Sequence, residues 1–252
     1  MESGGTEPTA MEAEELLRRL REAEGVELLR LVREHSGELT PNGARQALAN
    51  PFAGIEVIEE IAANRRLLSA YQVRRGLALH RTSPQPLALR YVPGLYWRDL
   101  LELAADTRVR PPIRRSAERY LIERLPSMAV GEKTTIARRA SHAVAAHLRN
   151  DPSRQVFRAL LENPRLTEGV LLPLVRKEDA LPQILEMVAA SPRWGVRYPI
   201  RAALCLNPRT PVAASLRLLP YLRKKDLRAV AAGVRVPAAV RRRAQVLLGD
   251  AR

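Results

Sequence analysis

The sequence predicts an all-α fold, a right-handed α-solenoid of about five repeats of ~42 residues that follows an N-terminal helical cap. Three observations predict this class. An Ala-Ala pair returns at nearly constant intervals, and apolar residues precede each pair at helical spacing. No segment shows the sustained two-residue alternation that is typical of a half-buried strand.

The repeat is defined by its Ala-Ala pairs, which lie 41 to 44 residues apart. The first alanines of the five pairs are Ala62, Ala104, Ala145, Ala189 and Ala231. An aliphatic residue stands directly before each pair, and another stands four positions before it in every copy except the third, which has Ser141. These spacings place the apolar residues on one helical face, so each copy is expected to contain a short helix that needs its neighbours to bury that face.

Two further elements are expected in the repeat. A second helix starts with an apolar residue followed by arginine, as in "VRRGLAL" from Val73. A third is expected where Ser or Thr precedes Pro84 and Pro211, because these hydroxyl residues are favoured N-caps and proline is tolerated at the first helical position. A shift of 127 residues, three repeat periods, places Leu77–Ala117 on Leu204–Ala244 without a gap.

The chain is expected to have three parts. Residues 1–10 are predicted to be a disordered tail, residues 11–48 an acidic N-terminal helical cap, and residues 49–252 a basic repeat solenoid. Within the cap, leucines at helical spacing predict a pair of short helices that separate near Gly25. A polar cap suits the exposed end of a repeat stack.

The charge is distributed unevenly along the chain. Residues 1–60 hold 6 Lys and Arg against 13 Asp and Glu, whereas residues 61–252 hold 36 against 14. The acidic residues of the second segment are too few to pair with its basic ones, so much of the surplus must face solvent. Such a surface attracts nucleic acid, acidic proteins or anionic membranes, and of these partners membrane is the least favoured because no amphipathic aromatic helix is evident.

Several motifs carry a family resemblance. The stretch "NDPSRQVFRALLENP", residues 150–164, resembles the second helix of a HEAT repeat, and the period with its three-helix division is similar to armadillo repeats. The "NPR" turns at Asn163 and Asn207 resemble those of bacterial leucine-rich-variant repeats. The resemblance covers residues 49–252 and implies a HEAT/armadillo-like solenoid, a shape that serves many binding functions.

The arginines have two interpretations. One arginine follows every Ala-Ala pair by three residues, and this ladder consists of Arg66, Arg108, Arg149, Arg193 and Arg235. In stacked repeats this regular row of cations would suit a phosphate backbone. We favour the structural interpretation, because an arginine near a helix C-terminus can bind the last carbonyls and a feature of every repeat usually serves the repeat. The candidate anion-binding residues are the other basic side chains: Arg74, Arg75, Arg114, Arg115, Arg158, Arg201, Arg223, Lys224, Lys225, Arg241, Arg242 and Arg243.

The sequence is compatible with three functions. We expect the first, a non-catalytic protein whose basic surface binds the phosphate backbone of nucleic acid. The alternative is a protein-interaction scaffold for an acidic or peptide partner. A third possibility is a HEAT-like alkylpurine DNA glycosylase, whose resemblance implies roles for Trp97, Asp99 and Trp194. Asp99 recurs as Asp226 under the 127-residue shift, which favours a helix-capping role instead.

Cys205 is the only cysteine, so no internal disulfide can form and a reducing, cytoplasmic location is expected. Its apolar neighbours predict a buried, unreactive thiol. The beginning of the chain lacks a basic-then-apolar secretory pattern, and no apolar run is long enough to span a membrane. The four histidines show no metal-ligand spacing, and we expect neither metal nor cofactor.

Overall fold

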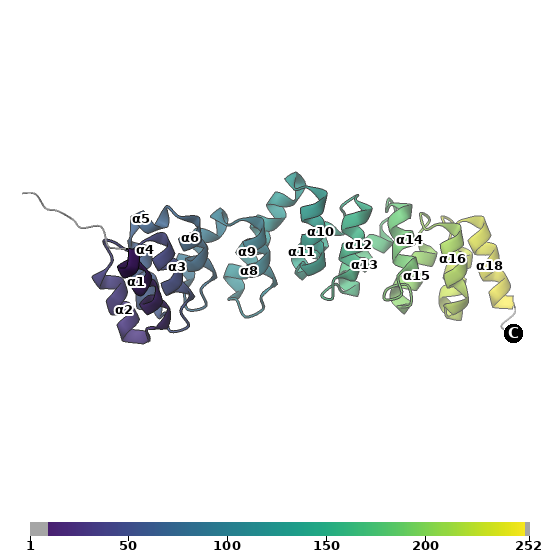
Figure 1. Cartoon of the computed structure of the whole chain (residues 1–252). Helices are drawn as coiled ribbons and strands as arrows, with labels where there is room; N and C mark the ends of the chain where they lie inside the picture. Colours follow the sequence, from purple (N-terminus) through teal and green to yellow (C-terminus); the bar gives the residue numbers. More distant parts are fainter. Residues whose placement is uncertain (1–9, 250–252) are drawn as a thin grey trace, which may run out of the picture. The chain divides into compact units, whose positions relative to one another are not determined.

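The computed structural model describes residues 10–249, and these form eighteen α-helices and three short 3-10 helices without a strand (Figure 1). The predicted all-α class is therefore confirmed. Of the predicted tail, residues 1–9 lie outside the described residues, and Ala10 begins the first helix.

Packing divides the chain into two units, Met1–Tyr120 and Leu121–Arg252, and the boundary falls inside helix α9 (Pro111–Arg124). The other helices of the first unit are α1 (Ala10–Glu22), α2 (Gly25–Glu34), α3 (Pro41–Ala49), α4 (Ile55–Ala63), α5 (Arg65–Leu68), α6 (Tyr71–Leu79), α7 (Gln85–Tyr91), η1 (Val92–Gly94) and α8 (Trp97–Ala105). The second unit holds η2 (Leu125–Ser127), α10 (Val130–Arg139), α11 (His142–Leu148), α12 (Arg154–Glu162), α13 (Glu168–Arg176), α14 (Pro182–Ala190), α15 (Tyr198–Leu206), α16 (Val212–Leu218), η3 (Leu219–Tyr221), α17 (Lys224–Ala232) and α18 (Ala238–Gly249).

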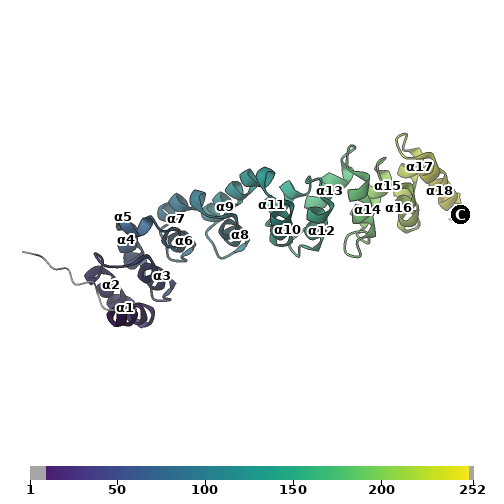
Figure 2. The same ribbon diagram turned by 45° about the horizontal axis from the view of Figure 1, so that its top comes forward.

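Helices of the second unit pack mainly on the helix two positions further along the chain. Thus α10 contacts α12, α12 contacts α14, and α13 contacts α15, and the same pattern continues to α18 (Figure 2). In the first unit, α1 packs on α3 and α2 packs on α4. Each unit therefore builds its core between helices that lie close in sequence, which is the arrangement expected when short amphipathic helices cover one another.

The predicted apolar face of the Ala-Ala helices is buried. The pairs lie in α4, α8, α11, α14 and α17, and the aliphatic residue before each pair is at most 2% exposed. Ser141, which departs from the apolar pattern, is the N-cap of α11, and its hydroxyl accepts a hydrogen bond from the Val144 amide. The one polar residue in the apolar pattern thus marks the position where α11 begins.

Within the predicted cap, α1 ends at Glu22 and α2 begins at Gly25, so the expected break between two helices is present. Gly25 has a φ of 39°, in the left-handed region that favours glycine. Gly25 therefore allows the tight turn at which the chain changes direction between α1 and α2.

The Ser83 and Thr210 hydroxyls do not cap helices as predicted. Helices α7 and α16 begin one residue after Pro84 and Pro211, so each proline occupies the N-cap position and each hydroxyl lies one residue too early. Both side chains are buried, and their hydroxyls have no hydrogen-bond partner among residues 10–249. The helix starts are set by the proline backbone instead, with ψ values of 136° and 133° that turn the chain into the helix.

Buried asparagines tie the ends of neighbouring helices together. Asn163, at the end of α12, donates its side-chain amide to the carbonyls of Ala137 and Ala140 at 2.9 and 3.0 Å, and its side-chain oxygen accepts from the Arg165 amide. Asn207 makes the equivalent bonds to the end of α13. Asn50 does the same for the end of α1. These side chains satisfy terminal carbonyls that helices leave unpaired.

Replacing Asn163 with alanine is expected to lower the free energy of unfolding by about 2 kcal/mol, because buried carbonyls would lose their donors. Equilibrium denaturation followed by circular dichroism measures the change. The control is Asn150→Ala, since Asn150 is exposed and lies in the same unit. Equal stability of the two variants would contradict a structural role for the asparagine bonds.

Candidate functional site

The positive charge is concentrated in the second unit. The first unit contains 18 Lys and Arg with 17 Asp and Glu, whereas the second contains 24 with 10. Residues 193–249 alone hold 13 basic residues and a single acidic one, Asp226. The Asp226 carboxylate accepts a hydrogen bond from the Tyr198 hydroxyl. Because Asp226 is the single acidic residue, this stretch has little internal means of neutralising its cations. The candidate functional surface therefore lies in this stretch.

Every ladder arginine has a partner within the chain. Three donate to backbone carbonyls: Arg66 to Leu39, Arg149 to Val170, and Arg193 to Asn163, Pro164 and Leu166. Arg108 pairs with the carboxylate of Asp106, and Arg235 pairs with that of Glu178. The guanidinium groups of the ladder are thus engaged in holding turns and neighbouring segments in place.

Several candidate anion-binding arginines are also engaged. Arg74 donates to the carbonyls five and six residues before it, and Arg201 does the same in the second unit. Arg75 forms ion pairs with Asp99 at 2.6 Å and with Glu102 at 3.0 Å. Arg114 reaches the Thr107 carbonyl at 3.5 Å. These four side chains have intramolecular roles that the basic character of the sequence alone does not show.

The remaining candidates are more exposed. The side chains of Arg115, Arg158, Arg223, Lys224, Lys225, Arg242 and Arg243 are exposed. Arg241 is half-buried, and its Nε has no hydrogen-bond partner among the residues that the structure describes. Four further exposed cations of the 193–249 stretch were missed by the sequence-based selection: Arg197, which pairs with Glu168, and Arg209, Arg217 and Arg228.

Arginines and tyrosines meet on the surface formed by α15, η3 and the start of α17. The Arg201 guanidinium lies 4.7 Å from the centre of the Tyr221 ring, and that of Arg223 lies 4.6 Å from the centre of the Tyr198 ring. The Tyr198 hydroxyl accepts a hydrogen bond from the Arg223 amide, which joins the start of α17 to α15. We call Tyr198, Arg201, Tyr221, Arg223, Lys224 and Lys225 the basic-aromatic patch.

The first unit contains another copy of the tyrosine and aspartate that underlie this patch. Under the 127-residue shift, Tyr71 corresponds to Tyr198 and Asp99 to Asp226, and in both copies the tyrosine hydroxyl donates to the aspartate. Each hydroxyl also accepts from the amide that precedes the next helix. Bonds present in both copies serve the fold. Burial, reinforced by the bond to Asp99, raises the pKa of Tyr71 to about 12.

The two copies differ on their surfaces. The first unit has Gly94, Tyr96, Trp97 and Arg98 where the second has Tyr221, Arg223, Lys224 and Lys225. The ion-paired Arg75 and Glu102 are replaced by Ala202 and Ala229. At these positions the second copy has three cations where the first has two, and it has no acidic side chain. Each copy exposes one tyrosine, Tyr96 in the first and Tyr221 in the second, but only Tyr221 is followed directly by three cations within four residues.

The residues of the glycosylase alternative have structural surroundings. Trp194 is 1% exposed and donates its indole N–H to the Leu161 carbonyl at 3.1 Å, so its ring is closed to a nucleotide. Asp99 lies in the first turn of α8 and is bonded to Tyr71 and Arg75. The N-cap of α8 is Tyr96 and no side chain caps the helix, so Asp99 is not the capping residue expected from the sequence. Its carboxylate instead binds Tyr71 and Arg75, although its place in the first turn is still electrostatically favourable for an acidic group. Trp97 is half-buried beside Arg98.

Asp99→Asn and Asp226→Asn are expected to destabilise the protein, each by about 1 to 2 kcal/mol, because a charged hydrogen-bond acceptor is lost from the same scaffold. The Asp99 variant should lose more, since Arg75 also donates to that carboxylate. Chemical denaturation of the two variants side by side measures both losses. A variant at Asp99 with unchanged stability would show that the carboxylate is held for another purpose.

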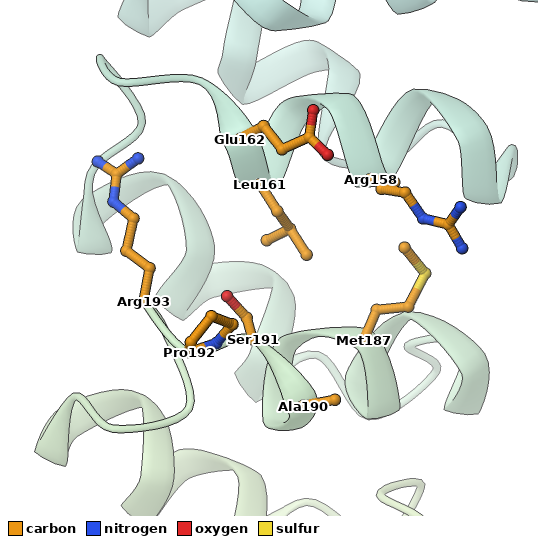
Figure 3. A pocket seen from close by; sticks show the side chains of 8 residues that line it. All are labelled: Arg158, Leu161, Glu162, Met187, Ala190, Ser191, Pro192 and Arg193. Atoms are coloured by element: carbon orange, nitrogen blue, oxygen red, sulfur yellow. The ribbon is translucent and has the colours of Figure 1, made fainter.

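A groove lies between α12 and α14, with a volume of about 420 Å³. Leu161 and Met187 point into it, and Arg158 and Arg193 lie at its two ends (Figure 3). Ala190 and Pro192 add to its apolar lining, and Glu162 to its polar rim. Such a groove suits an apolar side chain of a peptide more than a nucleotide phosphate.

Other chemistry is limited in the described part of the chain. Cys205 is buried as predicted, and burial raises the pKa of its thiol to about 12. Residues 10–249 contain no group of three or more His, Cys, Asp or Glu side chains arranged to hold a metal ion. No helix in this range is both long and apolar enough to cross a membrane.

The geometry thus defines an all-helical chain whose second unit carries a strongly basic surface. In comparisons with known proteins, no protein-family model and no curated protein matches the sequence. The functional assignment rests on the surface itself.

Proposed function

We propose that this protein is a non-catalytic nucleic-acid-binding protein that contacts the phosphate backbone through the basic surface of residues 193–249. The observation that carries the proposal is the ratio of 13 basic residues to one acidic residue in this stretch. Phosphate contacts need cations that are free to approach the backbone and no base-specific geometry. The exposed side chains of Arg217, Lys225, Arg228, Arg242 and Arg243 meet this requirement.

The repeat pattern supports a matching shape for the scaffold. We propose that the five Ala-Ala repeats form a right-handed, HEAT/armadillo-like solenoid, since equivalent helices recur at ~42 residues and equivalent bonds recur at Tyr71 and Tyr198. A repeat scaffold presents side chains from successive helices at regular spacing. Regular spacing of cations suits a ligand whose own charges are evenly spaced.

The second candidate is a protein-interaction scaffold, and the groove between α12 and α14 favours it. Its apolar lining would accept a peptide side chain, while Arg158 would attract an acidic neighbour. The groove lies outside the 193–249 stretch except for Arg193, whose guanidinium is already bound to three carbonyls. The surplus cations are therefore better explained by nucleic acid.

Fluorescence anisotropy with labelled duplex DNA, single-stranded DNA and RNA tests the proposal. Raising salt threefold from the physiological range is expected to weaken binding about twentyfold if three phosphates are contacted, because counterion release governs such complexes. Polyglutamate at equal charge concentration is the competitor. Displacement of nucleic acid by polyglutamate at that concentration would contradict the proposal and favour an acidic protein partner.

A further inference from the structure

We propose that Tyr221 is a stacking platform for an unpaired base, so that the second unit prefers single-stranded to duplex nucleic acid. This inference rests on the proposed function and specifies its ligand. Tyr221 is 64% exposed, so most of its side-chain surface is open to a ligand. It ends η3, a short 3-10 helix that leads directly into the cationic start of α17.

The fold does not need an aromatic residue at this position. The corresponding segment of the first unit, η1, ends at Gly94 with the same 3-10 conformation and the same preceding proline. The backbone after both segments is extended, with ψ near 150° at Leu95 and Leu222. The tyrosine ring is therefore an addition to a turn that forms without it.

The ring is held in place from one side. Arg201 lies against the Tyr221 ring, and its guanidinium also donates to the Gly195 and Val196 carbonyls at 3.4 and 3.2 Å. These bonds hold the cation beside the ring. Because most of the tyrosine surface still faces solvent, a base can stack on it without displacing protein contacts.

The neighbouring cations supply the other half of a single-strand site. Arg223, Lys224 and Lys225 follow Tyr221 within four residues, and all three are exposed. Proteins that bind single strands combine aromatic side chains under the bases with cations along the backbone. In a duplex each base is stacked between its neighbours, so its face is not available to the Tyr221 ring. The phosphates of a duplex remain available to the cations.

The experiment compares a labelled oligothymidine with an abasic oligonucleotide of the same length, which has the same phosphates but no bases. The unmodified protein is expected to bind oligothymidine about tenfold more tightly, the scale of one stacked base. Tyr221→Ala should bind the two oligonucleotides equally and retain the affinity for the abasic one. Tyr221→Phe should keep the preference, because the aromatic face is preserved.

Tyr96→Ala is the matched control, since Tyr96 is also 64% exposed but belongs to the first unit, where acidic and basic residues nearly balance. This variant should keep the full preference for oligothymidine. Equal, salt-sensitive binding of both oligonucleotides by the unmodified protein, or a preference retained in Tyr221→Ala, would overturn the stacking inference alone. Absence of binding to both would overturn the proposed function and this inference with it.

Discussion

Replacing Trp194 with alanine will lower the free energy of unfolding by about 4 kcal/mol, the largest loss expected from a single substitution in the second unit. Trp194 is the largest fully buried side chain of the described residues. The substitution leaves a cavity, removes the donor for the Leu161 carbonyl, and removes the cation–π contacts of the ring with Arg193 and Arg197. Denaturant unfolding monitored by circular dichroism measures the loss without depending on tryptophan fluorescence.

Trp97→Ala provides the control for the same chemical change. Trp97 is only half-buried at the first position of α8, so less apolar area is lost, and we expect a destabilisation of about 1 kcal/mol. If the two variants lost equal stability, Trp194 would not be a core residue. A stable Trp194→Ala protein would also reopen the glycosylase alternative, because the ring would then be dispensable to the fold.

Removing four cations from the second unit is expected to weaken nucleic-acid binding about tenfold or more and to flatten its salt dependence. The change combines Lys225→Ala, Arg228→Ala, Arg242→Ala and Arg243→Ala. None of these side chains forms an ion pair with another residue in the described range 10–249, so the fold should tolerate their loss. Anisotropy at several salt concentrations gives both the affinity and the slope.

A second quadruple variant removes the same charge from the first unit: Arg65→Ala, Arg81→Ala, Arg90→Ala and Arg98→Ala. All four side chains are exposed, so net charge falls equally in the two proteins. Binding that weakens equally in both variants would mean that total charge alone attracts the ligand. A loss confined to the first variant places the interface on the second unit.

The helical class was predictable because it depends on local pattern. The Ala-Ala pair marks the helix of each repeat, and the aliphatic residue directly before the pair is buried in all five helices. The break near Gly25 was predictable for the same reason, since glycine punctuates a helical pattern. The division within α9 was not, because no composition change in the sequence marks it.

The sequence predicts the excess of cations in the candidate site better than it predicts which of these side chains are exposed. The sequence shows how many cations lack acidic partners, but Arg74 and Arg201 bind backbone carbonyls, and a carbonyl has no sequence signature. The bond from Tyr71 to Asp99 joins residues 28 positions apart, beyond any helical period. Only the internal copy, Tyr198 with Asp226, offers a signal for that pairing. Asp99 lies within the matched segment Leu77–Ala117, but Tyr71 lies just before it.

The buried asparagines have a consequence for chemical ageing. Asparagine deamidates when the next backbone nitrogen attacks the side-chain carbonyl, and that attack requires a peptide N–H. Asn50, Asn163 and Asn207 are each followed by proline, which has none. A carboxylate formed at Asn163 would face the Ala137 and Ala140 carbonyls that its amide now bonds. The prolines therefore protect the helix-end amides from conversion into charges that the helix ends would repel.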